Sequence, residues 1–538
     1  MMPTEGITVL SAFLAAGLFS QQLYRSVPMD TTTEAATKRK VDSFFAQMTL
    51  EEKLDMLGGT GFATKLNVRL GIPELKMTDG PVGVRWGKST AFPASIAMAA
   101  SWDTGLVAQI GRALAREAKA KGRNVLLGPC INIQRVPHGG RNFESFGEDP
   151  YLASRITVAY VRGVQGEKVV ATPKHFACNN QEWERRTIDV RVDERALREI
   201  YLPAFKAAVQ EAGAWSVMTA YNKVNGAYSS ENAHLLTDIL KKEWGFQGFV
   251  MSDWEAVQST IETARAGLDL EMPEGKYLNK DALLKAVHEG KVSEAAIDDK
   301  IARVLRVMLV SEILNDHDRT GQTVLDTTEQ RALALEAARA GVVLLKNENN
   351  ILPLQPGKIK SIAIIGPNAA VARTGGGGSA HVKPVYAESP LEGMRNKVGN
   401  RMALNYAVGS RHPGDVSPID SSMLVPPNTP KGEHGLLGEY FNNKGLLGEP
   451  VLKRIDKQVN FDWGDESPAA ELPPDQFSVR WTGKLVPAAS AVYNLEVLSD
   501  DGVRLYFDNK LVIDDWHDHA EQMNTASVEL RAGATYDL

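Results

Sequence analysis

The sequence predicts an α/β protein that begins with a (β/α)8-type barrel, and three observations lead to this fold class. Short apolar runs alternate with amphipathic helices between Thr31 and Ile313, which is the pattern of strand-helix units around a parallel sheet. Six such runs fall in under 300 residues. Each run ends in polar or charged residues, as barrel strands do at the end that carries chemistry. We therefore predict a barrel domain over residues 31–315.

The predicted strands share a buried apolar segment with a polar end. They are LKMTDG (75–80), NVLLGPCIN (124–132), VVATPKHF (169–176), SVMTAYN (216–222), GFVMSDW (248–254) and LDLEMP (268–273). Because parallel barrel strands end at one rim, we expect these polar ends to meet there.

The helices between the strands are predicted from apolar spacing and end signals. From Asp193 to Ala212, apolar residues recur at three- and four-residue steps, and Gly213 is a plausible stop. Near the start of the chain, Thr49 and Glu52 have the spacing of a capping box.

A second α/β layer is predicted over residues 330–410, after a polar stretch. ALALEAARAGVVLLKNE (332–348) and KIKSIAIIGP (358–367) predict a helix and two strands, and GGGGSA (375–380) predicts a loop. From Arg411 to Gly435 the composition is that of a Pro/Ser-rich linker. Alternating apolar and polar residues over 435–538 then predict a separate antiparallel β module.

Composition excludes several classes of function. The net charge is −6, with no dense run of Lys and Arg, so nucleic acid is not expected as a partner. Cys130 and Cys178 are too few for a disulfide scaffold and lack zinc-site spacing. No segment reaches the roughly 20 apolar residues that span a membrane.

The first 28 residues are a candidate signal segment. Ile7 to Phe19 has the length of a signal-peptide core, although the preceding residues include Glu5 and no Lys or Arg. Export to the periplasm or the medium is favoured. The alternative is an upstream extension of a cytoplasmic protein that folds from about Met29.

Two glycine-containing motifs do not support a nucleotide cofactor, and we expect no cofactor. GKST (87–90) resembles a phosphate-binding loop, but Val82 stands where that motif needs glycine. The glycine run at 375 matches no dinucleotide fingerprint.

Charged residues cluster at the predicted strand ends. They are Asp79, Arg85, Arg135, Arg141, Lys174, His175, Arg185, Tyr221 and Asp253. With Trp254 as an apolar platform, this rim suits a polyhydroxylated ligand such as a sugar. For any one of these residues alone, a structural ion pair or a solvated position is the competing interpretation.

These residues and their neighbours resemble glycoside hydrolase family 3. The motifs are DGPVGVR (79–85), GRNFESFGEDPYL (140–152), KHFACNNQEWER (174–185), MTAYNKVNG (218–226) and FVMSDW (249–254), which occur in the family's order. The resemblance implies a barrel followed by an α/β sandwich domain, with the sugar at their junction.

The resemblance also implies roles for individual residues. Asp253 would be the nucleophile of a retaining β-glycosidase, and Asp79 would bind sugar hydroxyls at the far side of the −1 subsite. The further polar contacts would be Arg85, Arg141, Lys174, His175, Arg185 and Tyr221. Met218 and Trp254 would be apolar walls, and Ser379 would approach from the second domain.

Residues 435–538 resemble a PA14 domain, which some family members insert into the sandwich domain. There it narrows access to short substrates. The turn Asp500-Asp501-Gly502 matches the acidic turn that binds calcium in some PA14 lectins; an ordinary β-turn is the favoured interpretation, and no metal is assigned.

Retaining hydrolysis needs a second carboxyl group as acid/base, and no residue up to Leu538 matches its context in the family. One branch uses an Asp-His pair after the KHF motif, but the loop in this chain, ACNNQEWERRTIDV, has no histidine. In the β-glucosidase branch the acid/base is a late glutamate of the sandwich domain, after the PA14 insertion, so we expect it beyond residue 538 of an incomplete sequence.

We therefore predict a retaining exo-β-glucosidase that acts on a small oligosaccharide or an aryl β-glucoside. The alternatives are a β-sugar-binding protein without efficient catalysis and a β-xylosidase or broad-specificity β-glycosidase. Asp79 in its DGP context resembles the glucosidases. No membrane partner is expected, and homo-oligomerisation is left open.

Overall fold

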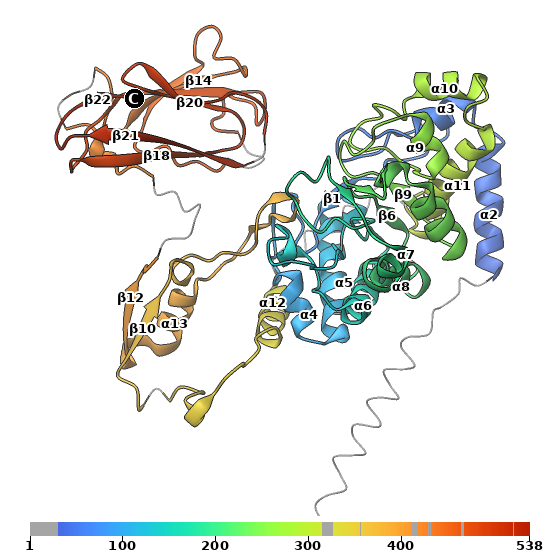
Figure 1. The fold of residues 1–538 in the computed structure, drawn as a ribbon, viewed down its shortest axis with the longest axis horizontal. Coiled ribbons are helices and arrows are strands. Elements are labelled where there is room, and N and C mark those ends of the chain that lie inside the picture. The colour runs from blue at the N-terminus through green and yellow to red at the C-terminus, as the bar shows by residue number, and fades with distance from the viewer. Residues whose placement is uncertain are drawn as a thin grey trace, which may run out of the picture. The chain divides into compact units, whose positions relative to one another are not determined.

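The computed structural model describes residues 31–314, 327–355, 357–410, 418–428, 430, 432–463, 467–519 and 521–538. The chain forms two compact units, Met1–Gln355 with Ala372–Ser389 and Pro356–Val371 with Pro390–Leu538 (Figure 1). The candidate signal segment, residues 1–28, lies outside the described residues. Among the helices of the described ranges, none is long and apolar enough to cross a membrane.

Parallel strands form the centre of the first unit. β1 (Met77–Asp79), β3 (Val125–Leu127) and β4 (Val170–Ala171) make one parallel sheet in the order β1-β3-β4. β6 (Ser216–Met218) pairs in parallel with β9 (Phe249–Met251). Every residue of these five strands is buried. Five of the six predicted strands therefore form, and the carboxyl ends within each sheet point the same way.

Single parallel bridges extend this series beyond the named strands. Phe176 bridges to Thr219, Met251 bridges to Leu270, and Gly58 bridges to Glu271. The LDLEMP run thus takes part through bridges rather than through a named strand. The α/β class is confirmed, whereas the closure of eight strands stays a prediction.

Helices cover the strands and pack closely on one another. They include α2 (Thr31–Phe45), α5 (Thr104–Ala120), α6 (Pro150–Gly166), α8 (Pro203–Gln210), α10 (Lys280–His288) and α11 (Glu294–Val310). A Cβ on Gly163 of α6 would lie 2.3 Å from the carbonyl oxygen of Ala108, and one on Gly111 would lie 2.6 Å from that of Tyr160. Glycine at both positions lets the backbones of α5 and α6 approach.

The predicted helix 193–212 is divided into three parts. Asp193 caps α7 (Glu194–Ala196) by accepting a hydrogen bond from the backbone N–H of Ala196, and a π-helical turn, η2 (Leu197–Tyr201), precedes α8. Gly213 follows with φ of 64°, a conformation that glycine adopts without strain. The capping box of Thr49 and Glu52 before α3 (Leu50–Asp55) is also confirmed.

Residues 330–410 are distributed differently from the prediction. α12 (Thr328–Ala340) packs on α4 (Ser95–Ala100) and α5, so it belongs to the first unit. The predicted strand in GVVLLKNE is wrong for this structure: residues 342–346 carry no strand, and Val342 to Leu345 are exposed. Apolar strand propensity alone does not form a strand without a neighbouring strand to pair with.

The loop segment 372–389 also belongs to the first unit. Its strand β11 (Lys383–Pro384) pairs in parallel with β2 (Lys88–Ser89). A Cβ on Gly376 would lie 2.4 Å from the ring of Phe143. The glycine run therefore forms the predicted loop, and glycine at 376 allows the loop to lie against Phe143.

In the second unit, β10 (Ser361–Ile365) pairs in parallel with β12 (Ala403–Ala407) beside α13 (Pro390–Val398). An antiparallel module follows, with β13 (Leu424–Val425), β14 (Leu436–Phe441), β15 (Leu452–Asp456), β16 (Ser478–Thr482), β17 (Lys484–Leu485), β18 (Ala491–Ser499), β19 (Val503–Phe507), β20 (Lys510–Asp515), β21 (Gln522–Leu530) and β22 (Tyr536–Asp537).

The predicted linker is shorter than its composition indicated. Residues 411–417 lie outside the described ranges, but Leu424 is buried in the core of the β module and β13 pairs with β17. The acidic turn at 500–502 joins β18 to β19. In the part of the chain that the structure describes, no group of three or more His, Cys, Asp or Glu side chains is arranged to hold a metal ion.

Candidate active site

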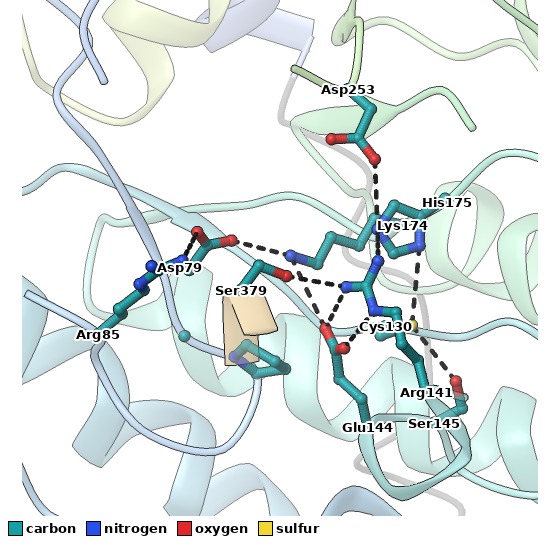
Figure 2. Close-up of polar contacts among 12 residues, drawn as sticks. Asp79, Arg85, Cys130, Arg141, Glu144, Ser145, Lys174, His175, Asp253 and Ser379 are labelled. Carbon is teal, nitrogen blue, oxygen red and sulfur yellow. Dashed lines mark hydrogen bonds and ion pairs between the residues drawn. The ribbon is translucent and has the colours of Figure 1, made fainter. Parts of the chain in front are cut away.

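Most of the predicted polar residues meet at the carboxyl ends of the parallel strands. Asp79 is the last residue of β1, Lys174 and His175 follow β4, and Asp253 follows β9 by two residues. Arg141 lies in the connection after β3, directly before the 3₁₀ turn η1 (Asn142–Glu144). Figure 2 shows their side chains converging.

Lys174 links two carboxylates at the centre of this cluster. Its Nζ lies 3.0 Å from Asp79 Oδ1 and 3.8 Å from Glu144 Oε1, and its side chain is only 2% exposed. Burial alone would lower the pKa of Lys174, but the charges of Asp79 and Glu144 hold it above the usual value. Lys174 therefore remains a buried cation. Arg85 lies at the edge, 3.8 Å from Asp79 Oδ2 and half exposed.

Arg141 is held by Glu144 in a two-pronged ion pair. Its Nε donates to Glu144 Oε2 at 2.7 Å and its Nη2 to Glu144 Oε1 at 2.8 Å. Burial alone would raise the pKa of Glu144, yet Arg141 and Lys174 hold it below the usual value. Such a planar pair fixes the guanidinium. Its remaining donors reach Ser379 Oγ and His175 Nε2, each at 3.0 Å.

Asp253 differs from the other carboxylates of the cluster. Its Oδ1 accepts a hydrogen bond from the backbone N–H of Trp254 at 2.7 Å. Its Oδ2 is buried and has no hydrogen-bond partner among the described residues. Burial raises the pKa of Asp253, an effect that the positive charges of Arg141, Lys174 and Arg185 partly offset. One carboxylate oxygen is thus left available for chemistry.

His175 lies between Arg141 and Asp253. Its Nε2 is 3.6 Å from Asp253 Oδ2, beyond hydrogen-bond distance. Burial and the charges of Arg141, Lys174 and Arg185 hold the pKa of His175 well below its usual value. The ring is therefore neutral and is no ion-pair partner of Asp253.

Arg185 and Tyr221 form a second layer beside Asp253. Arg185 donates to Glu182 Oε2 at 2.6 Å, and its guanidinium lies 4.4 Å from the centroid of the Tyr221 ring. Burial, and then the charge of Asp253, raise the pKa of Tyr221 well above its usual value. The phenol therefore keeps its proton and is able to donate a hydrogen bond.

The predicted apolar residues have different surroundings. The Trp254 ring packs 4.9 Å from the centroid of Phe62 and is half-buried. Met218, at the end of β6, is buried within the hydrophobic core. Arg135, named with the rim, is exposed, and its guanidinium lies 5.8 Å from the Tyr201 ring.

The sequence prediction missed four residues that hold the site together: Cys130, Asn132, Glu144 and Glu182. Glu144 lies three residues after Arg141 in the same motif, so its charge and spacing were a usable signal. Asn132 carried no such signal, because its contacts with His175 span 43 residues of sequence.

Comparisons with known proteins identify the family of the chain. The glycosyl hydrolase family 3 N terminal domain matches residues 25–307, and the PA14 domain matches residues 432–538. A β-glucosidase of Rhizobium radiobacter is 41% identical over 507 residues, which are 92% of this chain and 60% of that protein. Thermostable β-glucosidase B of Acetivibrio thermocellus is 42% identical over 398 residues, 71% of this chain and 52% of that protein.

Solved structures show the same relationship. The β-glucosidase from Kluyveromyces marxianus in complex with glucose matches with a TM-score of 0.75 and 33% identity, over 92% of this chain and 62% of that one. The β-glucosidase 3B from Thermotoga neapolitana in complex with glucose matches with a TM-score of 0.64 and 38% identity, over 68% of this chain and 55% of that one.

The chain spans about 60% of the length of the first relatives it matches. The family match nevertheless covers more than half of the chain, including every strand that carries the cluster. The chain therefore belongs to glycosyl hydrolase family 3.

Proposed function

We propose that this chain carries the nucleophile site of a retaining exo-β-glucosidase. The observation that carries the proposal is Asp253 Oδ2, a buried carboxylate oxygen without a hydrogen-bond partner in the described ranges, at the carboxyl end of a parallel strand. Barrel enzymes place their chemistry at this end. The names of the relatives, and the glucose bound in two similar structures, support the choice of sugar.

In the proposed reaction, Asp253 Oδ2 attacks the anomeric carbon and forms a glycosyl-enzyme ester while the aglycone leaves. Water then hydrolyses the ester. Hydrogen bonding through the Trp254 N–H holds the other oxygen of Asp253. Asp79, Arg141 and Lys174 would bind hydroxyls of the non-reducing glucose, with Trp254 as an apolar wall.

We assign no acid/base to residues 1–538. The other carboxylates of the cluster, Asp79, Glu144 and Glu182, are each paired with a cation: Lys174, Arg141 and Arg185 respectively. An ion pair with a cation favours the deprotonated carboxylate, whereas a general acid must carry a proton. These three therefore suit binding and support better than proton donation.

The first test is covalent labelling of the purified 538-residue chain. A 2-deoxy-2-fluoroglucoside with a reactive leaving group should add one sugar to Asp253, located by mass spectrometry of peptides. Tight glucose binding without an adduct would instead favour a sugar-binding protein. Faster labelling by the corresponding xyloside would favour a xylosidase or a broad-specificity enzyme.

The second test concerns the leaving group. Nitrophenyl β-glucoside needs little proton donation, whereas cellobiose needs much, and a general acid is typically worth about 10²–10⁴-fold. We expect slow release of nitrophenol and almost no turnover of cellobiose by this chain. Turnover of cellobiose at a rate similar to that of the nitrophenyl substrate would show that a proton donor is present among residues 1–538.

A further inference from the structure

Asn132 lies directly beside His175 because two segments of the rim run in parallel. Cys130 bridges to Lys174 in parallel, and the backbone N–H of Ile131 donates to the carbonyl oxygen of Lys174 at 2.7 Å. Asn132 is 7% exposed, and its side chain makes three contacts with His175. A weaker fourth contact comes from Cys130 Sγ, 3.7 Å from Asn132 Oδ1. The amide thus holds His175 at both backbone and ring.

Two of the contacts with His175 fix which way the amide points. Asn132 Nδ2 donates to the backbone carbonyl oxygen of His175 at 2.8 Å. Asn132 Oδ1 accepts from the backbone N–H of His175 at 2.9 Å. A carbonyl oxygen only accepts and a backbone N–H only donates, so exchanging the two ends of the amide would break both bonds.

The contact with the ring then decides where its proton lies. Asn132 Oδ1 is 3.0 Å from His175 Nδ1. Because this oxygen only accepts, Nδ1 must carry the proton. In a neutral ring Nε2 then carries a lone pair, which accepts from Arg141 Nη1 at 3.0 Å.

We propose that Asn132 is a positioning residue that holds His175 as the neutral tautomer with its proton on Nδ1, so that the ring accepts from Arg141 and donates no hydrogen bond to Asp253 Oδ2. The effect on catalysis rests on the proposed glucosidase function, in which Asp253 is the nucleophile. The tautomer itself rests only on the contacts above.

The groups around the ring agree with a neutral imidazole. The cations Arg141, Lys174 and Arg185 oppose its protonation, while Asp253 is the carboxylate that faces Nε2. Cys130 Sγ lies 3.9 Å from Nδ1. Burial raises the pKa of Cys130 to about 11, so the thiol stays uncharged and offers the ring no negative partner.

The proton position matters for the nucleophile. A proton on Nε2 would point toward Asp253 Oδ2, 3.6 Å away, and toward a donor of Arg141. Hydrogen bonding to a carboxylate stabilises its charge and weakens it as a nucleophile. Asn132 therefore acts on Asp253 through His175. By keeping His175 Nε2 unprotonated, it also leaves that nitrogen free to accept from Arg141 Nη1.

Nitrogen NMR of the full chain with ¹⁵N-labelled histidine tests the tautomer directly. The protein has 10 histidines, and the signals that vanish in His175→Gln identify the ring. We expect a pyrrole-like Nδ1 and a pyridine-like Nε2 from pH 8 to pH 6. A pyrrole-like Nε2, or a ring protonated on both nitrogens at pH 7, would overturn the proposal.

Two variants separate positioning from general support. Asn132→Leu removes the acceptor, so the form with the proton on Nε2 should appear and labelling of Asp253 should slow roughly tenfold to a hundredfold. Asn132→Asp keeps an acceptor at Nδ1 and should keep the proton there at pH 8. Its added charge should let the ring protonate at a higher pH than in the wild type.

Asn124→Leu is the matched control, because both ends of the Asn124 side-chain amide also hydrogen-bond to backbone groups but not to a histidine ring. Its Oδ1 accepts from the N–H of Lys76 and its Nδ2 donates to the carbonyl oxygen of Glu74. The His175 signals should not change in this variant. Identical His175 signals in the wild type and Asn132→Leu would refute the role of Asn132.

The two proposals fail separately. If no variant and no wild-type protein is labelled at Asp253, the proposed function fails while the NMR result on the tautomer stands. If labelling occurs but His175 carries its proton on Nε2, the proposed function stands and the role of Asn132 is wrong. If Asn132→Leu does not fold, the wild-type spectrum and Asn132→Asp still decide the tautomer.

Discussion

Two buried ionic clusters lie on opposite sides of β9 along the chain direction of the strand, and they are built differently. At the carboxyl ends, Lys174, Arg141 and Glu144 surround Asp253, whose Oδ2 has no partner within the described residues. The second cluster lies near the start of β9 and joins α11 to the strands. There, Lys241 pairs with Asp269 at 2.6 Å, and Lys300 donates to the carbonyl oxygen of Leu268.

The difference lies in what each cluster leaves unsatisfied. Asp269 also accepts from the backbone N–H of Val250 at 2.8 Å, so both of its oxygens are engaged. Asp253 has one engaged oxygen and one unpartnered oxygen among the described residues. A fully satisfied buried charge supports the fold, whereas an unsatisfied one costs stability and is kept where it reacts.

The largest expected effect comes from Asp253→Asn. Removing the nucleophile should abolish labelling and slow release of nitrophenol about 10⁴-fold or more, because covalent catalysis has no substitute group. Thermal unfolding should show no loss of stability, since Oδ2 makes no hydrogen bond within the described residues and burial already disfavours its charge.

The control is Asp238→Asn, which alters a carboxylate paired with Lys242 at 3.1 Å on an exposed helix face. It should leave both activity and stability almost unchanged. A large drop in the melting temperature of Asp253→Asn alone would mean that Asp253 supports the fold, and the contrast between the two clusters would disappear.

Lys300→Met probes the other cluster and should change stability rather than activity. Burial lowers the pKa of Lys300 from 10.5 to about 8. The unfolded chain therefore binds this proton more tightly than the folded one between pH 8 and 10.5, and stability gains as pH rises through that window. As the pH rises through that window, the free energy of unfolding of the wild type should therefore increase by about 3 kcal/mol more than that of Lys300→Met.

Chemical denaturation at pH 7.5, 9 and 10.5 measures this difference, and the variant cancels contributions from other groups. Labelling of Asp253 should proceed at the wild-type rate in Lys300→Met. A flat difference across this pH range would show that Lys300 is solvated in the folded protein, and a loss of labelling would link the two clusters functionally.

The smallest expected effect is that of Ser379→Ala. Its hydroxyl accepts from Arg141 Nη2 at 3.0 Å, but Glu144 alone already holds Arg141 through two bonds. Loss of one such hydrogen bond costs about 0.5–1.5 kcal/mol, so KM for nitrophenyl glucoside should rise less than about tenfold. A fall in the rate of labelling at saturating sugar would instead give Ser379 a role in the chemical step.

The sequence predicted which strand ends come together in the candidate site better than it predicted the boundaries of the second half of the chain. Asp79, Lys174 and Asp253 follow apolar runs at regular positions, and parallel strands bring such ends together whatever the connecting helices contain. The run at 342–345 had equal apolar character but remained exposed. A strand needs a partner to pair with, and propensity carries no information about that partner.

Sequence by itself determined the α/β class, the antiparallel module after residue 435 and the carboxylate at position 253, because these depend on local periodicity and on residue type. The tertiary structure alone decided which oxygen of Asp253 is unpartnered among the described residues, that Glu144 holds Arg141, and that Asn132 faces His175. These depend on contacts between residues far apart in the chain and on the direction of single hydrogen bonds, which no local pattern encodes.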